Sequence, residues 1–303
     1  MFDQLVCRVV GRGLEYTIVR PGISFCLIYS TPAEIIAPAV ADILEEYMAF
    51  IPQGALQAYL AADGTWKQAN KRVFGSTLRK LRSIESGNYA EFHFGQEPLA
   101  NVGDFGAHFK GGPLDDDFFP NESCTLYLEF PLSYSDPGCA DRLVGFVKNI
   151  ALMCRFDSGY CGYAFKHLHM TFCSESYEFI GRLAMRYAGF DICNDVIGLH
   201  ARGKISNVSW LNLFGEQISR ELGGIDEIRK NLAESMAAQS LNEGVFVRAA
   251  DVPIIGDVNR GAADVKPLQR LAELTKEIRL KVDNIGPREP EFAERWLSRF
   301  DEL

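Results

Sequence analysis

The stretch ISFCLIYSTPAEII, residues 23–36, contains the clearest signals of secondary structure in the sequence. Residues 23–29 are apolar, β-branched or aromatic, which is typical of a buried strand. Thr31 and Glu34 then have the spacing of a capping box, and Pro32 occupies the first helical position between them. The sequence therefore predicts a strand that passes directly into a helix.

The residues that follow support this helix and a second strand. Apolar residues recur at helical spacing over 35–51, although Pro38 is expected to distort the first turns because it lacks a backbone N–H. Residues 55–60 read as a strand, which ends before the turn signal of Asp63 and Gly64.

The same order of elements returns later in the chain. Residues 124–130 read as a strand, and Asp136 with Pro137 marks the start of a helix. An apolar stripe over 143–154 continues that helix, and residues 159–165 read as the next strand. The two strand–helix–strand units are similar in length, which indicates a structural duplication.

We therefore expect an α+β fold in one compact body, with two related strand–helix–strand units, an antiparallel sheet and a helical C-terminal third. The expected halves are residues 1–120 and 121–303. Further strands are predicted over 89–94, 103–109, 204–209 and 244–249, and further helices over 71–81, 175–187, 211–222, 226–235, 267–280 and 291–300.

Composition restricts the class of protein. The chain has 303 residues, 47% of them hydrophobic, and a formal charge of −9, which argues against disorder and against direct nucleic-acid binding. No apolar run approaches the ~18 residues that a membrane span needs, and the first residues show no export signal. Eight dispersed cysteines then read as reduced thiols, so we expect a cytoplasmic protein that does not contact a membrane.

Charge is distributed unevenly. Residues 64–84 carry six basic and no acidic residues, whereas residues 85–122 carry eight acidic residues against Lys110 alone. Phenylalanines are interleaved with these acids, and such a segment can dock a cationic protein, although charge runs more often mark a solvated face. If it docks a partner, the candidate binding residues are Glu97, Asp104, Asp115, Asp116, Asp117, Phe118, Phe119 and Glu122.

Catalytic and metal signatures are weak. Cys154, Cys161, His167 and His169 are proper zinc ligands, but their spacing fits no common zinc motif. We expect no catalytic residue, no metal and no cofactor, and hence a binding protein. A hydrolase that uses these four residues with Asp157, with or without zinc, is an alternative.

Several stretches together resemble the type VI secretion immunity family, the TsiV-type proteins. They occur in the family's order from about residue 14 to residue 280. The stretches are RPG at 20–22, IPQGAL at 51–56, DGTWK at 63–67, FDSGYCGYAF at 156–165, NVSWLNLFG at 207–215, LGG at 222–224 and GDVNRG at 256–261.

The resemblance implies a non-enzymatic antidote that binds and neutralises a cognate type VI toxin, often a nuclease, by covering its active site. A nuclease carries a basic cleft for its phosphate substrate, which an acidic surface can occupy. A structural adaptor of the secretion apparatus is a further alternative. The resemblance is compatible with two modes of inhibition: this protein plugs the active site of the toxin, or it holds the toxin in an inactive conformation.

Overall fold

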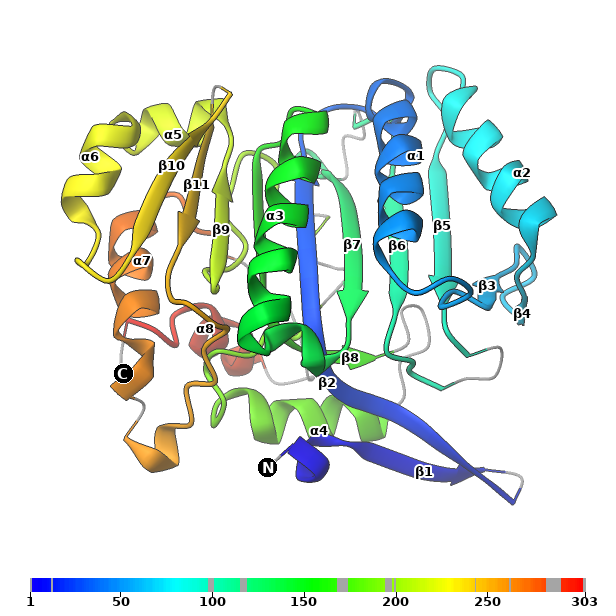
Figure 1. The fold of residues 1–303 in the computed structure, drawn as a ribbon, viewed down its shortest axis with the longest axis horizontal. Coiled ribbons are helices and arrows are strands. Elements are labelled where there is room, and N and C mark those ends of the chain that lie inside the picture. The colour runs from blue at the N-terminus through cyan, green and yellow to red at the C-terminus, as the bar shows by residue number, and fades with distance from the viewer. Residues whose placement is uncertain are drawn as a thin grey trace.

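The computed structural model describes residues 2–11, 13–97, 101–114, 119–167, 174–193, 198, 200–242, 244–261, 263–281 and 290–301. One antiparallel sheet of eleven strands runs through the molecule in the order β10-β11-β9-β8-β2-β7-β6-β5-β3-β4, with β1 paired to β2 (Figure 1). The strands are β1 Cys7–Gly11, β2 Leu14–Tyr29, β3 Ala58–Leu60, β4 Trp66–Gln68, β5 Ala90–Gly95, β6 Gly106–Gly111, β7 Cys124–Phe130, β8 Ser158–His167, β9 Leu211–Phe214, β10 Ala237–Leu241 and β11 Gly244–Arg248.

The helices among these residues lie around the sheet. They are α1 Ala33–Phe50, α2 Lys71–Arg82, α3 Pro137–Met153, α4 Ser174–Ala184, α5 Glu216–Glu221, α6 Gly224–Asn231, α7 Lys266–Thr275 and α8 Pro290–Leu297. Helices α1, α2 and α3 lie side by side on one face (Figure 1). The α+β class and the single compact body are confirmed.

Aromatic side chains join that helical layer to the sheet. Phe74 of α2 stacks on Phe94 of β5 with ring centroids 4.6 Å apart. Phe130 of β7 meets Tyr47 of α1 and Phe146 of α3 edge to face, at 5.3 and 5.8 Å. The helical stripes predicted from the sequence are therefore the surfaces that α1 and α3 bury.

Both predicted strand–helix–strand units are present, but they enclose different numbers of strands. In β7–α3–β8 the two strands are parallel because each pairs antiparallel with β2, which lies between them. In β2–α1–β3 the strands β2 and β3 are also parallel, and β7, β6 and β5 lie between them. Parallel strands need a crossover connection, and α1 and α3 supply it on the same face. Strand β2 of residues 1–120 thus lies between two strands of residues 121–303.

The start of α1 differs from the capping box that the sequence predicts. Pro32 is the N-cap residue, and no side chain caps the helix. The N–H of Ala33 instead donates to the carbonyl of Gly112 at 2.9 Å, so the end of β6 satisfies the first helical donor. The helix continues through Pro38 to Phe50.

The predictions around residue 210 are wrong in part. The expected strand over 204–209 is reduced to a bridge at Ile205, and the expected helix over 211–222 is divided. Leu211–Phe214 form β9, and only Glu216–Glu221 are helical. Strand β9 is buried along its length between β8 and β11, so its sequence lacks the alternation that identifies a strand. Three further strands, β1, β4 and β10, were not expected.

Candidate functional site

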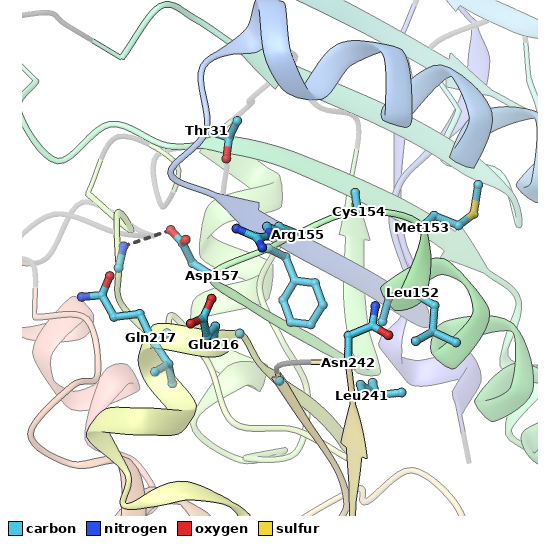
Figure 2. A pocket seen from close by; sticks show the side chains of 16 residues that line it. Thr31, Leu152, Met153, Cys154, Arg155, Asp157, Glu216, Gln217, Leu241 and Asn242 are labelled. Atoms are coloured by element: carbon cyan, nitrogen blue, oxygen red, sulfur yellow. Dashed lines mark hydrogen bonds between the residues drawn. The ribbon is translucent and has the colours of Figure 1, made fainter.

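Four turns meet at the end of the sheet that we call the pocket end (Figure 1). They are the β2–α1 turn at Thr31, the α3–β8 turn over 154–157, the β9–α5 turn at Gly215 and the β10–β11 hairpin at Asn242. Together they enclose a pocket of about 600 Å³ (Figure 2). Because these segments lie far apart in sequence, only the fold assembles the pocket.

Asp157 is the half-buried carboxylate of this pocket. Its Oδ2 accepts a hydrogen bond from the hydroxyl of Ser30 and another from the N–H of Gly203, the latter at 3.2 Å. Burial raises the pKa of the Asp157 carboxyl, while these two hydrogen bonds act in the opposite direction. The backbone of Asp157 is also fixed, since its N–H donates to the carbonyl of Ile28 at 2.8 Å. The carboxylate is thus held in place before any ligand arrives.

Gly215 allows the α3–β8 turn to approach the β9–α5 turn. A Cβ at this position would lie 2.0 Å from the carbonyl oxygen of Phe156, so only glycine fits. The N–H of Gly215 donates to the carbonyl of Asp157 at 2.8 Å. Two of the stretches that carry the family resemblance therefore meet at the pocket.

Arg202 joins the pocket to the acidic segment. Its guanidinium donates to the carbonyl of Leu114 at 2.5 Å and to that of Glu122 at 3.0 Å. Its N–H donates to the carbonyl of Asn121 at 3.1 Å. The next residue, Gly203, donates to Asp157, so one turn contacts Leu114, Glu122 and the pocket carboxylate.

The predicted binding residues lie at two ends of the sheet. Glu97 and Asp104 lie where β5 ends and β6 begins, at the end opposite the pocket. Asp104 is half-exposed and pairs with Arg20 of β2 at 2.8 Å. At the pocket end Phe119 is exposed, while Glu122 is buried with 6% of its surface accessible. Asp115, Asp116, Asp117 and Phe118 lie outside the described residues.

Most described phenylalanines of residues 85–122 belong to the core. Phe92, Phe94, Phe105 and Phe109 are all buried. Among the described phenylalanines of this segment Phe119 is thus the exposed one, and Tyr89 is exposed as well.

The described residues of the alternative hydrolase site make separate contacts in the structure. Cys154 lies beside the hydroxyl of Tyr29 at 3.8 Å, and burial raises the pKa of its thiol to about 11. Cys161 is buried midway along β8, and Nε2 of His167 lies 3.0 Å from the carbonyl of Cys193. No group of three or more metal-ligating side chains occurs among the described residues, and His169 lies outside them.

A row of buried polar side chains on the sheet face opposite α1–α3 was not foreseen. His93, His108 and Tyr127 are cross-strand neighbours on β5, β6 and β7, and Tyr160 of β8 continues the row. In the sequence, His93 alternates with Phe92 and Phe94, and His108 precedes Phe109. This alternation is the signal that puts the two histidines on the opposite face of the sheet from the phenylalanines.

Lys166 is the most deeply buried cation on this face. Its Nζ donates to the carbonyls of Gly103 at 2.9 Å and of Asp104 at 2.6 Å. Burial lowers the pKa of Lys166 to about 8. Lys166 and Arg20 therefore both hold the segment before β6 against β2 and β8.

The family model "Type VI immunity for VRR-NUC" matches residues 39–300. The chain belongs to the TsiV family. A solved structure titled "Pseudomonas aeruginosa T6SS protein PA0821" has a similar fold, with a TM-score of 0.76 and 17% sequence identity over 97% of this chain and 87% of that one. Comparison with curated protein sequences finds no match.

Membership in TsiV makes this chain a type VI immunity protein for a VRR-NUC toxin. Within the residues that the structure describes, no helix is long and apolar enough to cross a bilayer.

Proposed function

We propose that this TsiV protein binds its cognate VRR-NUC toxin in the cytoplasm of the producing cell and blocks the toxin's active site, without chemistry of its own. The observation that carries the proposal is the family match over residues 39–300. A nuclease must attract phosphate, so its active-site cleft is electropositive. A protein of formal charge −9 is attracted to such a cleft, and complementary charge accelerates the encounter.

The proposed contact surface is the pocket end of the sheet. Arg202 holds Leu114 and Glu122 there, and in the sequence Asp115, Asp116 and Asp117 follow Leu114 directly. Phe119, between Leu114 and Glu122 in the chain, is exposed and supplies an apolar contact of the kind that anchors interfaces. Glu97 and Asp104 lie at the other end of the sheet. A single toxin domain therefore contacts the pocket end or the end with Glu97 and Asp104 more readily than both ends at once.

A double substitution tests this surface. Asp115→Lys with Asp116→Lys is expected to slow association with a catalytically inactive toxin and to weaken binding roughly 10- to 100-fold, because attraction becomes repulsion. Surface plasmon resonance at two salt concentrations measures both effects. Glu97→Lys is a single charge reversal at the opposite end and is expected to change the affinity by much less than half of this effect. Unchanged affinity in the double variant would remove this segment from the interface.

A further inference from the structure

The pocket beside Asp157 has the shape and lining of a site for an amphipathic cation. Its volume of about 600 Å³ lies within the range of roughly 300–1,000 Å³ that is usual for ligand sites. We propose that it receives an arginine or lysine side chain from the DNA-binding surface of the toxin, with Asp157 as the pairing carboxylate. This inference rests on the proposed function and specifies one anchor of the interface.

The electrostatics of Asp157 favour such an occupant. The carboxylate accepts hydrogen bonds from the hydroxyl and the backbone N–H of Ser30 and from the N–H of Gly203, and its two oxygens, with about four acceptor positions in total, still have room for a cationic donor. Asp157 forms no ion pair with any residue that the structure describes, since the nearby guanidinium of Arg202 donates to backbone carbonyls instead. A half-buried carboxylate is already partly desolvated, so a cation that pairs with it forms a charge-assisted hydrogen bond with less further desolvation of the carboxylate.

The other lining groups match the rest of such a side chain. Glu216 adds a second carboxylate, although Arg220 already pairs with it. Leu152 and Leu241 give the pocket apolar walls, against which the aliphatic stem of a lysine or arginine packs (Figure 2). Asn242 at the hairpin supplies a further polar group at the rim. Arg155 also lines the pocket, so the lining holds two carboxylates and one cation.

The decisive variant is Asp157→Asn, which removes the charge and keeps an oxygen that can accept from Ser30 and Gly203. We expect it to weaken binding of the full-length, catalytically inactive toxin roughly 10- to 100-fold in isothermal titration calorimetry. Asp226→Asn makes the same change of charge on α6, outside the pocket, where Asp226 is 95% exposed. It is expected to leave the dissociation constant within about twofold, since exposed charges are screened.

A second variant keeps the test valid if Asp157→Asn disturbs folding. Leu152 is 48% exposed at the mouth of the pocket, so Leu152→Arg places a cation there without opening the core. It is expected to repel the incoming cation and to weaken binding to a similar extent. Thermal unfolding of each variant shows whether the fold is retained.

Cross-linking gives an independent reading of the occupant. A photoreactive residue in place of Gln217, which is exposed and lines the pocket from α5, is expected to capture a toxin peptide that contains arginine or lysine from the nuclease domain. If the wild-type protein binds toxin but folded Asp157→Asn and Leu152→Arg bind equally well, the pocket proposal is wrong and the proposed function stands. If the wild-type protein fails to bind a toxin of verified activity, both proposals fall.

Discussion

Arg202 donates from Nε to the backbone carbonyl of Glu122 at 3.0 Å. The other end of its guanidinium donates to the carbonyl of Leu114, so a single side chain joins Leu114 to Glu122. Charged donors on backbone carbonyls make stronger hydrogen bonds than neutral ones. The positions of Leu114 and Glu122 relative to the pocket turn therefore depend on one residue that lies at least eighty positions later in the chain.

Arg202→Met is expected to lower the free energy of unfolding by roughly 1–3 kcal/mol, because two carbonyls lose a charged donor. Urea denaturation measures this change. Limited proteolysis is expected to cleave the variant faster between residues 114 and 122 than elsewhere. Lys230→Met removes an exposed cation that pairs with Glu227 on α6, and is expected to alter stability by less than about 0.5 kcal/mol. If Arg202→Met has the stability and the cleavage pattern of the wild type, the contacts of Arg202 with Leu114 and Glu122 have no structural role.

Gly215→Ala is expected to destabilise the protein by about 1–3 kcal/mol, because the added methyl meets the carbonyl oxygen of Phe156 and the two turns must separate. Gly145→Ala is the control. Gly145 lies within α3 with open space around it, so alanine is expected to stabilise the helix by about 1 kcal/mol. Thermal and urea unfolding of both variants give the comparison. A neutral Gly215→Ala would mean that the pocket end tolerates rearrangement.

Lys166 gives the protein a pH dependence of known sign. Its pKa is about 8 in the folded protein and near the ordinary value of 10.5 in the unfolded chain. Between these values the unfolded chain holds the proton and the folded protein does not, so raising the pH favours folding. Below pH 8 both states are protonated and the cost of burying the cation is constant.

Lys166→Met isolates this effect from other titrating groups. The free energy of unfolding of the wild type, minus that of Lys166→Met, is expected to rise from about pH 8 to pH 10, by at most roughly 1.4 kcal/mol per pH unit. Urea denaturation at several pH values measures the difference. A difference that stays flat or falls over this range would contradict a depressed pKa for Lys166.

The sequence predicts elements well where apolar residues recur with a clear period. The stripes of α1 and α3 recur at helical spacing, and in Cys124–Phe130 the apolar residues alternate with Thr125, Tyr127 and Glu129, although the strand is buried on both faces. Strand β9 was misread as the start of a helix because Leu211–Phe214 are buried throughout. Strand β10, Ala237–Leu241, carries small and polar residues at the edge of the sheet and gives little hydrophobic signal.

The candidate site was less accessible to sequence reasoning. Asp157 was noted only as a neighbour of cysteines, since its partners Ser30 and Gly203 lie far away in the chain. The acidic segment was read as one face, whereas the strands β5 and β6 carry Glu97 and Asp104 to the opposite end. The sequence shows which charged residues follow one another along the chain. Which of them lie close together in space depends on the order and direction of the strands.

The most direct test of the central claim is a titration of the active toxin with this protein, with DNA cleavage as the readout. Binding at the active site predicts that cleavage falls in proportion to added protein and is abolished at one equivalent, with a stable complex recovered by size-exclusion chromatography. Loss of cleavage at a small fraction of one equivalent, without a complex, would instead show an enzymatic antidote. A stable complex that still cleaves DNA at full rate would contradict blocking of the active site.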